Sequence, residues 1–219
     1  MGSDIFEHVG IDPIEDLKVS TGKDGSRYYV TPSGKKYPSV TTVTGWEKRE
    51  FFKEWRKKNP KESVRVLSVG NRMHKVVEDF INNKKDCLSD CKPDVVSLFY
   101  YLKPLLKQIS NVRAQEIALW SDTLRMAGRA DCIADYKGKL SIIDFKSSRR
   151  EKKREYIDNY FAQATAYSIM WQEITKKPID QIVILISSED GSIQEFVDKP
   201  INHVRTLKNM IDLYWDHHA

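Results

Sequence analysis

The spacing of apolar residues divides the chain into a first part with helical periodicity and a second part that begins with strands. Two short runs, residues 27–30 and 36–43, flank the turn-forming sequence Thr31-Pro32-Ser33-Gly34 and predict a β-hairpin. Beyond them, apolar residues recur at helical intervals as far as residue 109. The predicted helices cover residues 46–60, 62–82 and 93–109.

From residue 113 onward the pattern changes to runs with the length of β-strands. The expected strands are residues 113–121, 124–136 and 139–147, the last two joined as a hairpin. A long helix, a second pair of strands and a closing helix follow, over residues 151–176, 181–188, 193–198 and 201–215. This order predicts an α/β core that is preceded by a helical, basic N-terminal portion.

The composition is that of a globular protein with free thiols. Of the 219 residues, 40% are hydrophobic and 31% are charged, and no apolar run approaches the roughly 18–20 residues of a membrane span. The acidic first 18 residues lack the apolar core of a signal peptide. We therefore expect a cytoplasmic protein of a bacterium or phage, or a mitochondrial matrix protein whose presequence has been removed. The three cysteines, with Cys87 and Cys91 one helical turn apart, predict free thiols in a reducing compartment.

Basic charge is concentrated in two segments. The formal net charge is only +5, but residues 46–75 hold 10 basic and 4 acidic residues, and residues 146–154 hold 6 basic and 1 acidic. The local charges are therefore +6 (10 − 4) and +5 (6 − 1), which leaves −6 (5 − 6 − 5) for the rest of the chain. This distribution indicates a localised surface for a polyanion. The alternative is a lysine-rich helix face that is simply solvated.

Two aspartates and a lysine are predicted to meet on one face of the hairpin of residues 124–147. If Lys137-Gly138 forms a two-residue turn, cross-strand partners have numbers that sum to 275, and Asp131 lies opposite Asp144. Their Cβ atoms would be about 4.5–5.5 Å apart. Lys146 projects from the same face, because side chains alternate along a strand.

Facing carboxylates destabilise a sheet unless a proton or a cation lies between them, so this pair predicts a divalent ion. Mg²⁺ favours carboxylate oxygens and water, and a lysine beside it can hold a nucleophilic water or neutralise charge on a phosphate. The alternative is a slipped register that leaves one aspartate as a turn or edge residue. We favour that explanation only for Asp135, which adjoins the turn, because the apolar residues around the trio predict a buried strand.

The order of these residues resembles the active-site signature of the PD-(D/E)XK nuclease superfamily. The signature elements are Glu116, the Gly-Arg-Ala-Asp of residues 128–131 and the Asp-Phe-Lys of residues 144–146. Two more elements resemble the RecB-like branch of that superfamily. They are a Gly-x-x-x-His at residues 70–74, with Glu78 one turn later, and a Gln-x-x-x-Tyr at residues 163–167.

Within this branch the chain is similar to the genome maintenance exonucleases of mitochondria and to related phage exonucleases, over about residues 38–188. The resemblance implies a restriction-endonuclease-like core, a mixed central sheet flanked by helices, in a single nuclease domain of residues 1–219. Residues 38–110 would form its helical, basic portion and residues 111–219 its catalytic core. Divalent-metal hydrolysis of phosphodiester bonds, on single-stranded DNA threaded through the protein, is implied as well.

The same resemblance assigns roles to individual residues. Lys146 would activate or position the attacking water, Glu116 would orient Lys146 or bind a second metal, and Gly70 would let its helix approach the sheet closely. The implied metal ligands are His74, Asp131, Asp144 and the backbone carbonyl of Phe145. The implied DNA contacts are Gln163, Tyr167, Ser39, Thr41, Ser147, Ser148 and Arg149. Outside this context, the same histidine, glutamate and hydroxyl residues would be ordinary structural side chains.

Mg²⁺ or Mn²⁺ is the cofactor that we expect. The chain has three cysteines and none after Tyr167, where iron–sulfur nucleases need them, so no Fe–S cluster is expected. Cys87 and Cys91 without a nearby histidine pair argue against zinc, and the lack of a G-x-x-x-x-G-K-[ST] motif argues against a nucleotide cofactor. Most of the aromatic residues at positions 46, 51, 52 and 55 are expected in the core, and any exposed one would stack on bases.

These features favour a metal-dependent exonuclease that acts on single-stranded DNA, flaps or ends in DNA replication, repair or recombination. We expect the protein to be a monomer and not to associate with a membrane. One alternative is a structure-specific endonuclease of the resolvase type, with the same active site and a different groove. The other is a non-catalytic single-stranded-DNA-binding protein. The last is disfavoured, because every polar member of the signature is present.

Overall fold

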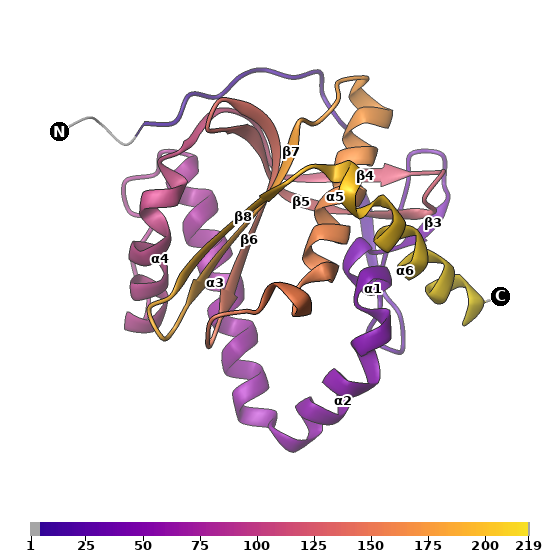
Figure 1. Cartoon of the computed structure of the whole chain (residues 1–219), viewed down its shortest axis with the longest axis horizontal. Helices are drawn as coiled ribbons and strands as arrows, with labels where there is room; N and C mark the ends of the chain where they lie inside the picture. Colours follow the sequence, from indigo (N-terminus) through magenta and orange to yellow (C-terminus); the bar gives the residue numbers. More distant parts are fainter. Residues whose placement is uncertain (1–4, 219) are drawn as a thin grey trace.

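A five-stranded mixed sheet forms the centre of the computed structural model, which describes residues 5–218 (Figure 1). The strand order is β4-β5-β6-β7-β8, and neighbours are antiparallel except for β6 and β7. The strands are β4 (Ile109–Ser121), β5 (Met126–Tyr136), β6 (Lys139–Ser148), β7 (Gln181–Ser188) and β8 (Ile193–Asp198). A parallel pair needs a crossover connection, and helix α5 (Asp158–Thr175) supplies it between β6 and β7.

Helices cover both faces of this sheet (Figure 1). On one face lie α3 (Pro60–Ile81) and α4 (Pro93–Leu106), and on the other lie α5, α1 (Val40–Thr44) and α6 (Val204–Asp216). Strand β7 is buried on both sides, with Val183 and Leu185 in the core beneath α3 and α4, and Ile182 and Ile184 in the core beneath α5. This arrangement confirms the predicted α/β fold, a mixed central sheet flanked by helices.

A small antiparallel sheet precedes the helices and packs on the ends of β4 and β5. It has the order β1 (Lys18–Thr21), β2 (Arg27–Val30), β3 (Lys36–Pro38). The predicted hairpin is therefore present, but its second strand is shorter than expected. The Ser39 hydroxyl accepts a hydrogen bond from the backbone N–H of Thr42 at 3.0 Å, and this cap starts α1 where the sequence pattern suggested continued strand.

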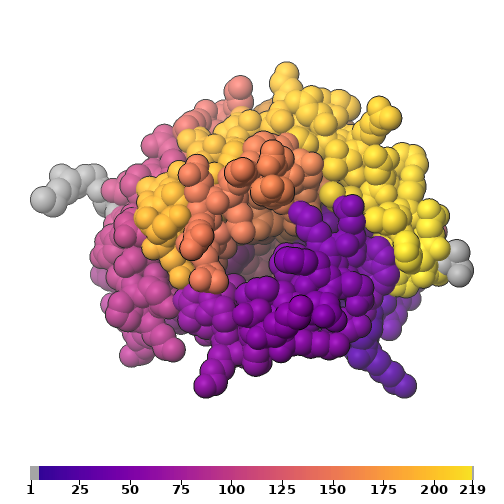
Figure 2. Space-filling view, turned by 60° about the horizontal axis from the view of Figure 1, so that its bottom comes forward, coloured from indigo at the N-terminus to yellow at the C-terminus, as the bar shows by residue number. Residues whose placement is uncertain are grey.

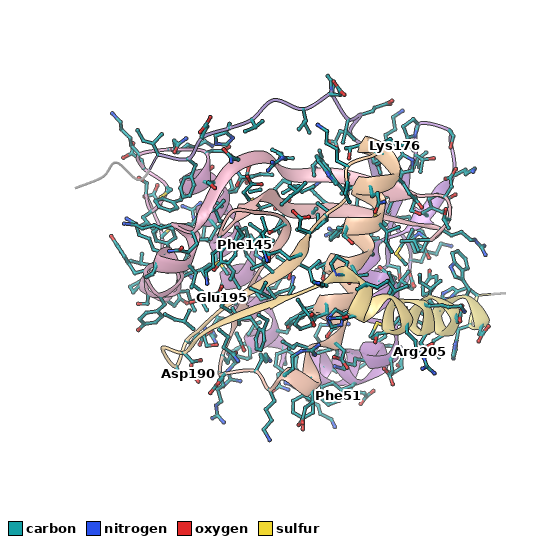
Figure 3. All side chains as sticks on the ribbon, turned by 45° about the horizontal axis from the view of Figure 1, so that its top comes forward. Phe51, Phe145, Lys176, Asp190, Glu195 and Arg205 are labelled. Carbon is teal, nitrogen blue, oxygen red and sulfur yellow. The ribbon has the colours of Figure 1, made fainter. Side chains whose placement is uncertain are left out.

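The basic segment forms an exposed helical hairpin with α3. After η1 (Trp46–Lys48), helix α2 (Arg49–Lys58) has no buried residue, and the side chains of Phe51 and Phe52 are 67% and 46% exposed. Figure 3 shows Phe51 at the edge of the molecule and Phe145 near its middle. The expectation that most aromatic residues of this segment lie in the core is wrong for α2, because the helix projects away from the body (Figure 1).

Other boundaries differ by a few residues. Residue 109 begins β4 and does not extend α4. Residues 151–157, where the sequence pattern predicts the start of the long helix, contain only η2 (Arg154–Tyr156), and α5 begins at Asp158. Near the C-terminus, η3 (Pro200–His203) precedes α6. Within residues 5–218, no helix combines the length and the apolar character that crossing a membrane requires.

Candidate active site

The turn between β5 and β6 has the geometry that the sequence predicts. Lys137 and Gly138 both have positive φ, 49° and 79°, as a type I′ turn requires, and the paired residue numbers sum to 275. The ladder of pairs stops one position short of the two aspartates. There the Asp131 carboxylate accepts a hydrogen bond from the backbone N–H of Phe145 at 2.9 Å, which anchors Asp131 beside Asp144.

One cavity of about 510 Å³ gathers most of the predicted site residues. It lies between α3, α5 and the strands β4–β6, and residues just before and within α1 close one side. The predicted residues that line it are Ser39, Thr41, His74, Glu116, Asp131, Lys146, Gln163 and Tyr167. Helix α3 contributes a stripe at helical spacing, in which Asn71 and Lys75 accompany His74 and Glu78. The sequence motif points to His74 and Glu78 as functional residues, but not to Asn71 or Lys75.

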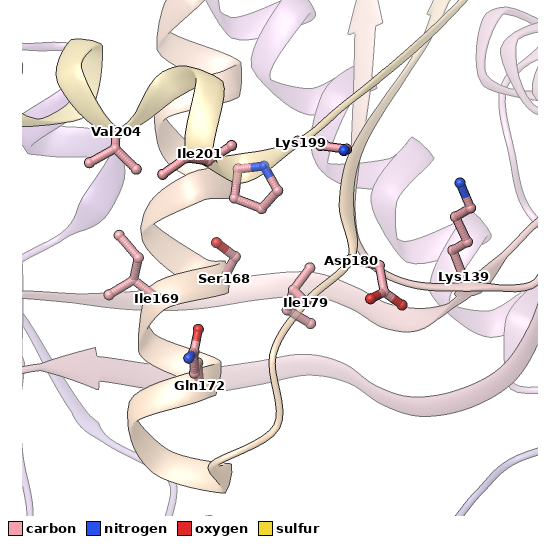
Figure 4. Close-up of a pocket in the computed structure, with 10 residues that line it drawn as sticks. Lys139, Ser168, Ile169, Gln172, Ile179, Asp180, Lys199, Ile201 and Val204 are labelled. Atoms are coloured by element: carbon pink, nitrogen blue, oxygen red, sulfur yellow. The ribbon is translucent and has the colours of Figure 1, made fainter.

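A larger cavity of about 790 Å³ lies elsewhere on α5 (Figure 4). Ser168, Ile169 and Gln172 line it, on a different face of the helix from Gln163 and Tyr167. None of the predicted site residues lines this larger cavity. We therefore identify the candidate site by the titratable and polar side chains that line the smaller cavity, and not by cavity volume.

Three groups with metal-binding side chains meet in the smaller cavity. Ligand atoms of His74, Glu116 and Asp131 all lie within 4.8 Å of one another. The His74 Nδ1 atom is 3.5 Å from an Asp131 carboxylate oxygen. One imidazole and two carboxylates at this spacing can hold a divalent cation: the carboxylates suit Mg²⁺ or Mn²⁺, and the imidazole suits transition metals.

Glu116 is brought into this cluster by an unusual backbone conformation. Its φ is +48°, an uncommon value for a residue other than glycine and a costly one within a strand. The Arg129 guanidinium donates a hydrogen bond to the Glu116 backbone carbonyl, which helps to hold this conformation. Burial, followed by the nearby charges of Asp131 and Glu78, raises the pKa of Glu116 to about 7. A group that is strained and electrostatically unfavourable is typical of a functional site.

Replacement of Glu116 by glutamine is therefore expected to stabilise the metal-free protein at alkaline pH. The pKa is raised above its ordinary value of 4.5, so the ionised carboxylate costs stability progressively from pH 4.5 to about 7 and fully above that. The side chain is partly exposed, so we expect about 1 kcal/mol after solvent screening, or a Tm higher by about 2–4 °C. Thermal unfolding of Glu116→Gln should show this gain near pH 8 and little of it near pH 5.

Divalent ions provide the control for that comparison. Added Mn²⁺ should raise the Tm of the unaltered protein and should raise that of Glu116→Gln much less, because one ligand has lost its charge. An equal response of the two proteins to Mn²⁺ would contradict a role for Glu116 in the metal site.

Beneath the cavity, Asp144 and Lys146 form a buried ion pair. The Lys146 Nζ atom lies 2.7 Å from each carboxylate oxygen of Asp144, and the Gln163 amide donates to Oδ1 at 3.1 Å. Burial raises the pKa of Asp144 above its usual range, against the opposing effect of Lys146. Lys146 also lies over the ring of Tyr160, 5.2 Å from its centroid. Tyr160 precedes Gln163 by one helical turn, and this spacing is the signal that could have identified it.

One oxygen of Asp144 has unused hydrogen-bonding capacity. Oδ2 is buried and accepts no well-directed hydrogen bond, although Lys146 is close to it. The Lys146 ammonium, 2.7 Å away, balances the charge of this oxygen, and the oxygen keeps lone-pair capacity for a further cation. That capacity and the neighbouring His74–Glu116–Asp131 cluster fit a divalent metal ion.

Four of the predicted DNA-contacting residues differ from the others. Some form hydrogen bonds or ion pairs with nearby protein groups, and three of them do not line the cavity. Ser39 caps α1, as described above, although it also lines the cavity. Ser148 donates a hydrogen bond to a backbone carbonyl two residues further on, at 2.7 Å, and the Arg149 guanidinium lies 3.4 Å from the Glu62 carboxylate. Ser147, Ser148 and Arg149 are not among the residues that line the cavity.

The two motif glycines differ in how tightly they are packed. A Cβ at Gly70 would stand 3.5 Å from the Ser147 hydroxyl, an ordinary contact, so the close helix–sheet approach expected of Gly70 does not require glycine. A Cβ at Gly128 would stand 2.7 Å from the hydroxyl of Tyr167. Glycine at position 128 therefore makes room for Tyr167 in the cavity wall.

Comparison with known proteins agrees with this geometry. Residues 98–214, just over half of the chain, match the model of the PD-(D/E)XK nuclease superfamily. Mitochondrial genome maintenance exonuclease 1 of Homo sapiens is 31% identical over 134 residues, which cover 58% of this chain and 38% of that protein. The protein of the same name from Mus musculus is 28% identical over 145 residues, 59% of this chain and 43% of that protein. The matched region thus spans less than half the length of these relatives.

Among solved structures, a candidate exonuclease from Eubacterium rectale aligns with a TM-score of 0.48 and 10% identity, over 69% of this chain and 65% of that chain. A similarity at this level adds nothing to the family match.

Proposed function

Since the chain belongs to the PD-(D/E)XK nuclease superfamily, we propose that it is a divalent-metal-dependent exonuclease that hydrolyses phosphodiester bonds at the ends of single-stranded DNA. The observation that carries this proposal is the single cavity in which His74, Glu116 and Asp131 face a lysine held by a buried aspartate. Residues 111–219 would hold the catalytic core, residues 38–110 would supply most of the strand-binding surface, and the protein would act as a monomer.

In the proposed reaction, His74, Glu116, Asp131, Asp144 and the backbone carbonyl of Phe145 would hold Mg²⁺ or Mn²⁺. When bound there, such an ion polarises a phosphate oxygen and lowers the pKa of a water molecule. Asp144 and the ring of Tyr160 fix the ammonium group of Lys146 at the floor of the cavity. From that position the Lys146 Nζ atom donates a hydrogen bond to the attacking water or to a phosphate oxygen on which charge develops.

A ring of protein beside the cavity supports the preference for single strands with free ends. Figure 2 shows a hollow bounded by the α2–α3 hairpin and by the segment that follows β6. Two contacts close the ring between these parts. Lys48 donates a hydrogen bond to the backbone carbonyl of Tyr156 at 3.1 Å, and Arg149 lies 3.4 Å from Glu62. Both basic segments of the chain contribute to the ring, and such charge attracts the phosphates of a strand that passes through it.

Circular and linear single-stranded DNA of equal length test this function. We expect the linear molecule to be degraded with Mg²⁺ or Mn²⁺, while the circle, which has no end to thread, stays full length over the same time. EDTA should abolish the degradation, because the reaction needs a divalent ion.

Each contrary outcome points to a different alternative. Cutting of the circle would favour a structure-specific endonuclease. Binding without products under every metal condition would favour a non-catalytic single-stranded-DNA-binding protein.

A further inference from the structure

A second, smaller cavity adjoins the candidate active site. It has a volume of about 290 Å³ and is lined by Trp46, Arg49, Phe52 and Arg56 on one side and by the start of α1 on the other. Thr41 lines both this cavity and the catalytic one. The two cavities are therefore neighbours, and we call the smaller one the α2 pocket.

Packing does not explain two of the side chains that α2 presents to this pocket, those of Phe52 and Arg56. No residue of α2 is buried, and the Phe52 side chain is 46% exposed, so its ring contributes little to a core. An exposed aromatic ring beside basic groups is typical of a surface that contacts a ligand. The guanidinium of Arg56, one turn after Phe52, forms no hydrogen bond or ion pair within residues 5–218 and is available to an external anion.

Contacts within the chain hold the rest of the pocket lining in place. On the α2 side, the Arg49 guanidinium lies over the ring of Trp46, 4.6 Å from its centroid, and forms an ion pair with Asp24 at 2.9 Å. The Ser39 hydroxyl is within hydrogen-bond distance of the hydroxyls of both Thr41 and Thr42. These contacts hold a planar cation and a row of hydroxyl groups in place before any ligand binds.

We propose that the α2 pocket binds one nucleobase of the substrate strand, a short distance along the strand from the bond that is cleaved. The base stacks on the ring of Phe52, and Arg56 contacts an adjoining phosphate. At about 290 Å³ the pocket is at the lower end of ligand sites, which range from about 300 to 1,000 Å³, so it suits one planar group. Because every base has an aromatic face, this contact would hold the strand in register without regard to sequence. The assignment rests on the proposed nuclease function.

The test uses end-labelled single-stranded DNA with one abasic position. If a base must occupy the α2 pocket, degradation should pause at one fixed distance from the abasic position, when the missing base would be in the pocket. Loss of one stacked base should slow that step about 5- to 150-fold. Phe52→Leu should degrade normal DNA more slowly and should lose the pause, because the variant has no stacking contact for the abasic position to remove.

Tyr100→Leu is the matched control. Tyr100 is an aromatic residue of α4 that is 56% exposed and lines neither the catalytic cavity nor the α2 pocket, so this variant should keep both the rate and the pause. A pause that persists unchanged in Phe52→Leu, or no pause in the unaltered protein while it degrades DNA, would overturn the proposal. Failure of the unaltered protein to degrade any DNA would instead count against the proposed nuclease function, and equal Tm values would show that both variants are folded.

Discussion

Replacement of Lys146 by methionine is expected to slow DNA cleavage by about 100- to 1,000-fold, the usual loss when one preorganised charge or hydrogen-bond donor is removed from an active site. The Lys146 ammonium is held 2.7 Å from the Asp144 carboxylate and lines the catalytic cavity. Methionine keeps the length of the side chain and removes the charge. Single-turnover cleavage of a linear single strand, with saturating Mn²⁺, measures the loss.

The same substitution should also destabilise the fold, and this effect can be separated from catalysis. Asp144 is only 2% exposed, so without Lys146 a buried carboxylate is left unpaired. We expect a loss of about 2–3 kcal/mol in urea unfolding, below the range for fully buried pairs, because 18% of the Lys146 side chain is exposed. The loss should be larger near pH 8 than near pH 5, since protonation of Asp144 relieves it at low pH.

A double variant separates the two effects. Asp144→Asn together with Lys146→Met removes both charges and should recover most of the stability, while cleavage stays at the level of the single variant or below. If the double variant regained activity, Lys146 would have no direct role in the reaction. If Lys146→Met alone were as stable as the unaltered protein, the buried pair would not exist in solution.

The parts of the site that follow from local sequence could be predicted. A two-residue turn with glycine at its second position specifies the β5–β6 register, and this register alone brings Asp131 and Asp144 together. Helical spacing likewise places Gln163 and Tyr167 on one face of α5. These rules act over a few residues, so no knowledge of the rest of the fold is needed.

Features that depend on distant contacts could not be predicted. The positive φ of Glu116 goes with a hydrogen bond from Arg129, thirteen residues away in the chain, and nothing in the neighbouring sequence indicates it. The pattern of α2 has the apolar positions of a packed helix, but periodicity does not say whether the apolar face meets the core or a ligand. After Ser39 the chain could continue as a strand or begin a helix that the Ser39 hydroxyl caps. The helix forms because α1 packs against α5 and β5.

The largest effect on metal binding is expected from Asp131→Asn. Asparagine keeps an oxygen that can accept the hydrogen bond from Phe145, so the hairpin should stay intact, but it removes the negative charge from the centre of the cluster with His74 and Glu116. Mn²⁺ affinity, followed by calorimetry or electron paramagnetic resonance, should fall by at least about 100-fold, the upper end of what changes around a ligand alone cause. Cleavage should fall with it and recover in part at high Mn²⁺ concentration.

Asp135→Asn is the matched control, because it is the same substitution on the same strand. Asp135 lies outside the cavity and forms an ion pair with Arg113 at 2.6 Å, so its loss should lower stability slightly and leave Mn²⁺ affinity unchanged. Asp131→Asn should not lose stability in this way, since Asp131 raises the pKa of Glu116 by charge repulsion and its neutralisation relieves that repulsion. Equal Mn²⁺ affinity in the two variants would place the metal away from β5, and the cluster at the floor of the cavity would then need another explanation.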